Sequence, residues 1–92
     1  MTIYQERDYN SYIENGKTLL QTAENYYEEK CFGAAIKSYY RASLNFEMAK
    51  EIAIKAVDVA LKIQANELEY YCLEKIDELE QFKKVSIDEY TK

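Results

Sequence analysis

Apolar residues recur every three or four positions along three stretches of the chain, the spacing of helices that each bury one face. The first stretch predicts a helix from about Tyr9 to Lys30. The second begins after Gly33 and alternates steps of four and three, which predicts one helix of about thirty residues. The third predicts a helix over about residues 67–84. The stripe of the second helix consists of Ala35, Tyr39, Ala42, Phe46, Ala49, Ala53, Ala56, Ala60 and Ile63.

Two positions mark the expected corners between these helices. Gly33 can adopt the backbone geometry of a tight corner, so the first turn is expected at residues 31–33. Asn66 is a weak helix breaker and marks the second corner, although one unbroken helix from 34 to 83 would also satisfy the pattern. Gly16 has another role, because it lies on the buried stripe of the first helix, where a missing side chain lets a neighbouring helix come close.

The sequence therefore predicts an all-α fold, an antiparallel three-helix bundle with a long central helix. The single predicted domain covers residues 9–84, between an N-terminal segment over 1–8 and a polar C-terminal tail over 85–92. The chain contains no proline and only two glycines, which favours long helices. A second apolar row beside the alanine-rich stripe indicates that the central helix touches both neighbours. That row consists of Ile36, Tyr40, Leu44, Met48 and Ile52.

Composition narrows the classes of function. The net charge is -5, so the phosphates of a nucleic acid would meet mostly repulsion, and we expect no nucleic-acid partner. No secretory signal and no apolar run of membrane-spanning length is apparent, which predicts a cytoplasmic protein without a membrane span. The chain has no histidine, which excludes Ser-His and Cys-His catalysis. We therefore expect no enzymatic activity, no cofactor and no metal site.

The two cysteines, Cys31 and Cys72, lack the CxxC spacing of a redox or zinc site. In a three-helix arrangement they are expected near opposite ends, roughly 35 Å apart by helix rise and beyond the reach of a disulfide. Their predicted role is that of small apolar side chains.

Two Tyr-Tyr pairs surround the first corner. Adjacent helical residues point about 100° apart, so only one member of each pair can face the core. By the apolar stripe, Tyr26 and Tyr39 are predicted to point inward. The tyrosines predicted at the boundary, with wet hydroxyl groups, are Tyr27, Tyr40 and one of Tyr70 and Tyr71. Half-buried tyrosines are enriched at binding surfaces, but ordinary boundary residues of a tyrosine-rich core remain an equal alternative.

The residues around this corner have the spacing of one tetratricopeptide-like helical hairpin. They are Ala23, Tyr26, Phe32, Ala35, Tyr39 and Ala42. A repeat array is not indicated, because a shift of 34 residues does not reproduce the pattern. A hairpin followed by a third helix resembles the microtubule-interacting and trafficking domain, and "CLEKIDEL" from Cys72 to Leu79 is similar to that family's third-helix motif. The resemblance covers about residues 12–82, with Cys72 replacing the usual aromatic residue.

The resemblance implies an adaptor that binds a short amphipathic helix, with basic residues, from a partner protein between its second and third helices. By position, Leu73 would form the apolar floor, while Glu74 and Asp77 would meet a basic residue of the ligand. The opposing interpretation makes Leu73 ordinary core and the two acids solvated surface. The predicted partner-binding residues are Tyr27, Tyr40, Tyr70, Leu73, Glu74 and Asp77. The alternative function is a self-associating structural protein, a homodimeric helix bundle paired through the alanine stripe, the tyrosines or the third helix.

Overall fold

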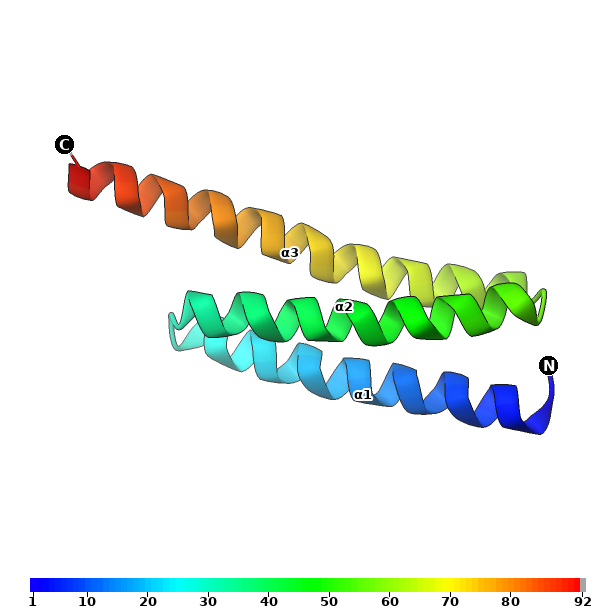
Figure 1. The fold of residues 1–92 in the computed structure, drawn as a ribbon. Coiled ribbons are helices and arrows are strands. Elements are labelled where there is room, and N and C mark those ends of the chain that lie inside the picture. The colour runs from blue at the N-terminus through cyan, green and yellow to red at the C-terminus, as the bar shows by residue number, and fades with distance from the viewer. Residues whose placement is uncertain (92) are drawn as a thin grey trace.

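The computed structural model describes the backbone of residues 1–91 and the side chains of residues 1–81. Three helices are joined by short corners: α1 (Ile3–Glu28), α2 (Phe32–Lys55) and α3 (Val59–Thr91) (Figure 1). No strand occurs over residues 1–91, and the predicted all-α three-helix bundle is confirmed. Over the same part of the chain, none of the helices is both long enough and apolar enough to cross a membrane.

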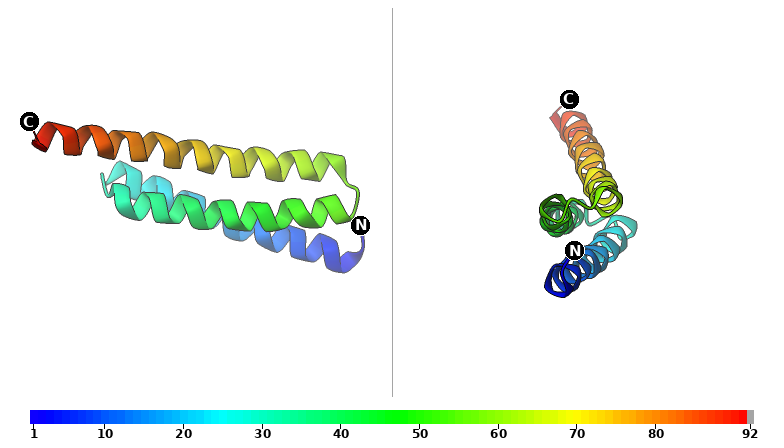
Figure 2. Two further views of the ribbon diagram at one scale, coloured as in Figure 1. Left: turned by 45° about the horizontal axis from the view of Figure 1, so that its top comes forward. Right: turned by 90° about the vertical axis from the view of Figure 1, so that its right-hand side faces the viewer.

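The helices run antiparallel in chain order, and α1 and α3 each pack along α2. Viewed end-on, the three helices form a triangle with α2 at one corner (Figure 2). The Cα atoms extend over 57 × 19 × 13 Å, so the bundle is long and thin. The last turns of α3 continue past the corner between α1 and α2 (Figure 1).

The predicted alanine-rich stripe forms the centre of the core from Ala35 to Ala53, where Tyr39 and Phe46 are the largest fully buried side chains. Its predicted continuation was wrong, because α2 ends at Lys55, and Ala60 and Ile63 are exposed on α3. Small side chains at the helix crossings let α1 and α3 approach α2 closely. The fully buried alanines of α2 are Ala35, Ala42, Ala49 and Ala53. The other buried apolar residues are Tyr9, Ile13 and Ala23 from α1, and Ala65, Cys72 and Leu79 from α3.

The buried glycine of α1 confirms the predicted close approach. A Cβ atom added at Gly16 would lie 2.5 Å from Cε1 of Phe46 and 2.8 Å from two further ring atoms. The ring of Phe46 therefore occupies the space that a side chain at this position would need.

Polar contacts connect α3 to both other helices. The hydroxyl group of Tyr9 donates a hydrogen bond to the backbone oxygen of Leu61, 2.9 Å away. The Lys50 Nζ and Glu69 Oε1 atoms lie 2.6 Å apart, in side chains that are only 23% and 14% exposed. A half-buried ion pair of this kind fixes the register of α2 against α3, because displacing either charge would leave its partner poorly solvated.

The corner between α1 and α2 is built by Lys30, not by glycine. The backbone N–H groups of Lys30 and Cys31 donate to the oxygens of Tyr27 and Tyr26, which is the pattern of a Schellman motif. Lys30 adopts a φ of 62°, while Gly33 has no positive φ and lies inside α2. The predicted role of Gly33 at this corner was therefore wrong.

The corner between α2 and α3 lies at residues 56–58, so neither a break at Asn66 nor an unbroken helix is correct. The same Schellman pattern recurs, with hydrogen bonds from Val57 N to Ile54 O and from Asp58 N to Ala53 O. Asp58 then caps α3, because its Oδ1 atom accepts a hydrogen bond from the Leu61 N–H at 3.1 Å. As a result α2 has 24 residues, fewer than the roughly thirty predicted for a long central helix, and it is the shortest of the three helices.

Both outer helix ends also extend beyond their predicted limits. α1 begins at Ile3, because Thr2 and Gln5 form a reciprocal capping box with hydrogen bonds of 2.9 and 3.1 Å. Most of the N-terminal segment predicted over 1–8 therefore belongs to α1. At the other end, the backbone of α3 remains helical to Thr91, so the tail expected at residues 85–92 is helical over 85–91.

The two cysteines lie closer together along the bundle than predicted. Leu79 and Phe32 line the same small cavity beside the first corner, and Cys72 precedes Leu79 by only two helical turns, roughly 10 Å. The expected separation of about 35 Å was too large, because it assumed that α3 begins near residue 67. Cys31 is exposed, Cys72 is buried, and both thiols are free.

Val57 gives a test of the second corner. Its φ of 55° is unfavourable for a β-branched residue, so Val57→Gly is expected to raise the free energy of unfolding by about 1 kcal/mol. Val59→Gly is the matched control, since this exposed valine has ordinary helical geometry and its replacement should lower the free energy of unfolding by roughly 0.5 kcal/mol. Urea unfolding followed by circular dichroism measures both; a loss of stability in Val57→Gly would contradict the strained corner.

Candidate functional site

A surface cavity of about 220 Å³ opens between α1 and α3 close to the first corner. We call it the tyrosine groove, and its lining residues are Glu24, Tyr27, Glu28, Tyr39, Tyr71 and Lys75. All three helices contribute: residues spaced by three and four on α1 form one wall, and Tyr71 and Lys75, four residues apart on α3, form the other. Tyr39 of α2 lies at its base.

One hydrogen bond crosses the tyrosine groove. The Tyr71 hydroxyl donates to Oε1 of Glu24 at 3.2 Å. Burial, followed by the charge of Glu24, raises the pKa of Tyr71. Lys75 lies over the Tyr71 ring, with Nζ 5.7 Å from the centroid, and Nζ is 3.4 Å from Oε2 of Glu78. Burial opposes the charge on Lys75, but Glu78 and then Tyr71 outweigh it and raise its pKa, so this amine is protonated near neutral pH.

The base of the groove is neutral and unreactive. Burial raises the pKa of Tyr39 to about 12, with a further contribution from Glu24. Burial also raises the pKa of the Cys72 thiol to about 12, helped by the charges of Glu24 and Glu69. Because the thiolate is the nucleophilic form of cysteine, this thiol is inert near neutral pH. Among the described side chains, no group of three cysteine or acidic residues is arranged to hold a metal ion.

The rim of the groove combines aromatic surface with negative charge. The Tyr27 ring is 48% exposed and packs edge-on against Phe32, with centroids 6.0 Å apart. Tyr71 is 37% exposed on the opposite wall. Glu24 and Glu28 carry two negative charges against the single positive charge of Lys75. Apolar rings bordered by excess carboxylate suit a ligand that has both an apolar and a cationic group.

The predicted division of the tyrosine pairs is half correct. Tyr39 is buried, as the stripe of α2 predicted, and Tyr40 is exposed. Tyr26 was predicted to point inward but is 37% exposed, so that prediction was wrong. The core of α1 at this level is supplied by Ala23, and Tyr26 lies three residues further on, near the end of the helix.

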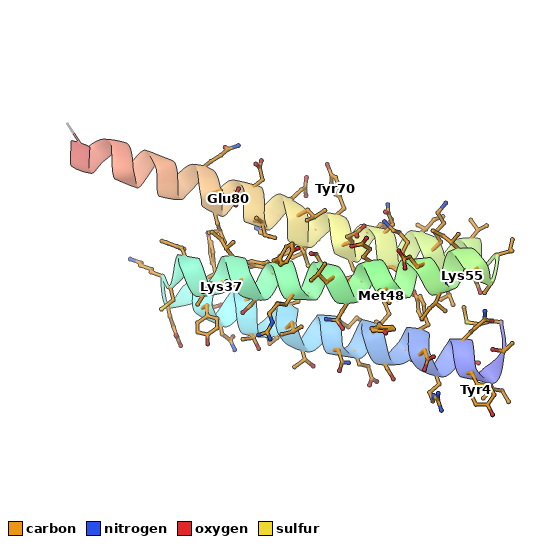
Figure 3. All side chains as sticks on the ribbon, viewed as in Figure 1. Tyr4, Lys37, Met48, Lys55, Tyr70 and Glu80 are labelled. Atoms are coloured by element: carbon orange, nitrogen blue, oxygen red, sulfur yellow. The ribbon has the colours of Figure 1, made fainter. Side chains whose placement is uncertain are left out.

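The six predicted partner-binding residues are distributed over all three helices, and their role in binding stays a prediction. Of these, only Tyr27 lines the tyrosine groove. Leu73 is 47% exposed and lies one turn after Glu69, which places it on the side of α3 that faces α2. Tyr70 is 62% exposed and points away from α1 and α2 (Figure 3).

The remaining three predicted residues are also exposed. Tyr40 is 54% exposed on α2. Glu74 and Asp77 are solvent-facing on α3, and Asp77 accepts a hydrogen bond from Gln81 at 3.2 Å. Exposed Leu73, Glu74 and Asp77 leave the α3 surface implied by the family resemblance accessible, but this surface and the tyrosine groove lie on different sides of α3.

Sequence reasoning missed three of the groove residues, Glu24, Glu28 and Lys75, and left Tyr71 as an alternative to Tyr70. Their spacing on each helix was readable, because residues four apart share a face. That these residues lie together in the fold could not be predicted, because it depends on which turns of α3 lie beside which turns of α1. The position of the corner at residues 56–58 determines this alignment.

Comparison with family models, with curated proteins and with solved structures finds no match to this chain. The fold and the groove define the class as a three-helix bundle with an aromatic, acidic surface cavity. The resemblance to the microtubule-interacting and trafficking domain stays a prediction.

Proposed function

We propose that this protein is a non-enzymatic adaptor that binds a short amphipathic segment of a partner protein in the tyrosine groove. The observation that carries this proposal is the pair of exposed rings, Tyr27 and Tyr71, facing each other across a cavity whose base is buried Tyr39. Rigid aromatic walls offer contact area at little cost in side-chain entropy.

The charges of the groove favour a ligand with basic residues. A lysine or arginine of the ligand would approach Glu24 or Glu28 and lie against the tyrosine rings, where cation–π attraction adds to the ion pair. Apolar ligand residues one turn away would cover Tyr27 and Phe32. In the family that the chain resembles, the ligand lies between the second and third helices instead, and Leu73, Glu74 and Asp77 would then make the contacts.

A reducing, cytoplasmic location belongs to the same proposal. An exposed Cys31 and a buried Cys72 that are both unpaired fit a compartment in which thiols stay reduced.

Selection of a displayed peptide library on the full chain, followed by fluorescence anisotropy with the enriched peptides, tests this function. We expect basic amphipathic peptides whose affinity falls by about tenfold or more in Tyr27→Ala and Tyr71→Ala. Tyr70→Ala is the matched control, because the neighbouring Tyr70 does not line the groove and points about 100° away from Tyr71, so its removal should leave binding unchanged.

Two outcomes would contradict the proposed site. Binding that is lost in Leu73→Ala and retained in Tyr71→Ala would move the ligand to the α2–α3 side. If the library yields no peptide that binds the folded chain, the adaptor function itself is rejected.

A further inference from the structure

The face of α2 opposite the core carries an exposed apolar row. Leu44 follows buried Ala42 by two residues and therefore points about 200° away from it, out of the bundle. Tyr40, Leu44 and Met48 are 54%, 42% and 43% exposed. Neither α1 nor α3 therefore covers the middle of this row, although the sequence led us to expect that it contacts a neighbouring helix. In the end-on view α2 stands at one corner of the triangle of helices (Figure 2).

Charges of opposite sign flank the two halves of this row. Lys37 and Arg41 lie toward the start of α2, and Glu47 and Glu51 lie toward its end. All four are exposed, and none forms an ion pair with any of the side chains described over residues 1–81. Each pair places like charges four residues apart, an arrangement that mildly destabilises an isolated helix. A positive half and a negative half thus share one helix face without partners.

The face is complementary to itself about Leu44. On this face, a residue a given number of positions before Leu44 is complementary to the residue the same number of positions after it. Apolar residues correspond to apolar residues, and basic residues correspond to acidic ones. The matched pairs are Arg41 with Glu47, Tyr40 with Met48, Lys37 with Glu51, and Ile36 with Ile52. A twofold axis through Leu44 brings each residue onto its match in a second copy, which is the requirement of a closed, symmetric dimer interface.

We infer that the chain forms an antiparallel homodimer in which the outer faces of two α2 helices pack around Leu44. Residues spaced by four along a helix form a ridge, and two such ridges interlock when the helices cross at about -50°. At this crossing angle the two helices diverge away from the crossing point, so the apolar contact would be confined to the turns around Leu44. Arg41 of each copy then lies opposite Glu47 of the other copy. Each of these two residues, which has a like charge four residues away on its own helix, thereby gains a partner of opposite charge.

This dimer differs from one paired through the alanine stripe or the tyrosine groove. The part of the alanine stripe from Ala35 to Ala53 is buried between α1 and α3 and is not accessible to a second chain. The tyrosine groove lies between α1 and α3, away from the outer face of α2, so the dimer would carry two free grooves. The inference therefore stands independently of the proposed function, and failure of peptide binding would leave it intact.

The first measurement is the mass of the full chain by sedimentation equilibrium from about 1 µM to about 1 mM, at low and high salt. We expect the mass to rise from 10.9 kDa toward twice that value. The dimer should weaken at high salt, because the flanking charges are screened. A mass of 10.9 kDa at every concentration would overturn the inference.

Leu44→Asp tests the apolar centre. It places two like charges together on the twofold axis, and we expect the dimer to weaken by about a hundredfold or more. Ile63→Asp is the control, because it adds the same charge at a 51% exposed position of α3. Circular dichroism verifies that both variants fold. Equal weakening by both variants, or a larger effect of Ile63→Asp, would overturn the proposed interface.

Charge reversal tests the antiparallel register. In a homodimer of the Arg41→Glu variant, the new glutamate of each copy lies opposite Glu47 of the other copy, which makes two contacts between like charges. A homodimer of the Glu47→Arg variant likewise has two contacts between the new arginine and Arg41. Each variant should therefore dimerise about tenfold more weakly. A mixture of the two variants restores opposite charges at both contacts, and we expect the heterodimer to recover the original affinity. Homodimers that remain as strong as the unaltered dimer, or a mixture without recovery, would exclude this register.

Discussion

The protein is expected to lose stability steeply as the pH rises from about 9 to about 12. The buried Cys72 thiol has an ordinary pKa of 9.0, and burial raises this pKa to about 12 in the folded chain. Between these values the unfolded chain releases a proton that the folded chain retains, so the free energy of unfolding falls with pH. A difference of about three pKa units corresponds to roughly 4 kcal/mol.

Ionisation of Tyr39 also lowers the free energy of unfolding, at slightly higher pH. The pKa of Tyr39 rises from 10.0 to about 12 on folding, so its contribution to the free energy of unfolding is fully present below pH 10 and is lost as the pH approaches 12. Two pKa units add about 3 kcal/mol to the alkaline loss. A small domain typically has only about 5–15 kcal/mol in total, so we expect unfolding before both groups have titrated.

Cys72→Ala separates the thiol from the general effect of high pH. Alanine cannot ionise, so the variant should start somewhat less stable at neutral pH but lose less stability above pH 9 than the unaltered chain. Urea unfolding at a series of pH values provides the comparison, with Cys31→Ala as the control for the exposed thiol. Parallel pH profiles for Cys72→Ala and the unaltered chain would show that burial does not hold the Cys72 proton.

The helices themselves were readable from the sequence, because amphipathic spacing depends only on neighbouring residues. All six residues of the stripe from Ala35 to Ala53 are buried in α2, and the stripe omitted only the buried Ser38 and Ser43. The corners were harder to predict, because their left-handed backbone conformation is adopted by residues that rarely take it. Val57 takes a left-handed conformation that usually indicates glycine, whereas Gly33, the expected corner residue, is helical.

That error at the second corner propagated to the site. With α3 beginning at Val59 instead of near residue 67, α2 is also about eight residues shorter, so every residue of α3 shifts by about sixteen residues, or roughly four turns, relative to α1. Tyr71 then meets Glu24, a contact that no local pattern encodes. Tyr27 and the buried Tyr39 were predictable because their environment depends mainly on the first hairpin, which the sequence positioned closely enough.

Gly16→Ala is expected to destabilise the protein by about 3 kcal/mol, near the upper end for one added methyl group in a packed core. The new Cβ would lie 2.5 Å from the Phe46 ring, which is fully buried and held between helices. Either the ring must leave its position or α1 must move away from α2, and both responses loosen the contacts of the alanine stripe. Urea unfolding of the full chain measures the loss.

Gly33→Ala and a double variant show whether the cause is the steric contact. A Cβ at Gly33 meets nothing within 4 Å, and alanine is the better helix former, so this variant should gain up to about 1 kcal/mol. Phe46→Leu removes ring atoms from the contact, so Gly16→Ala should cost about 1–2 kcal/mol less in the Phe46→Leu background than alone. Strict additivity of the two substitutions would mean that Gly16 and Phe46 are not in contact, and the tight crossing of α1 and α2 would then lie elsewhere.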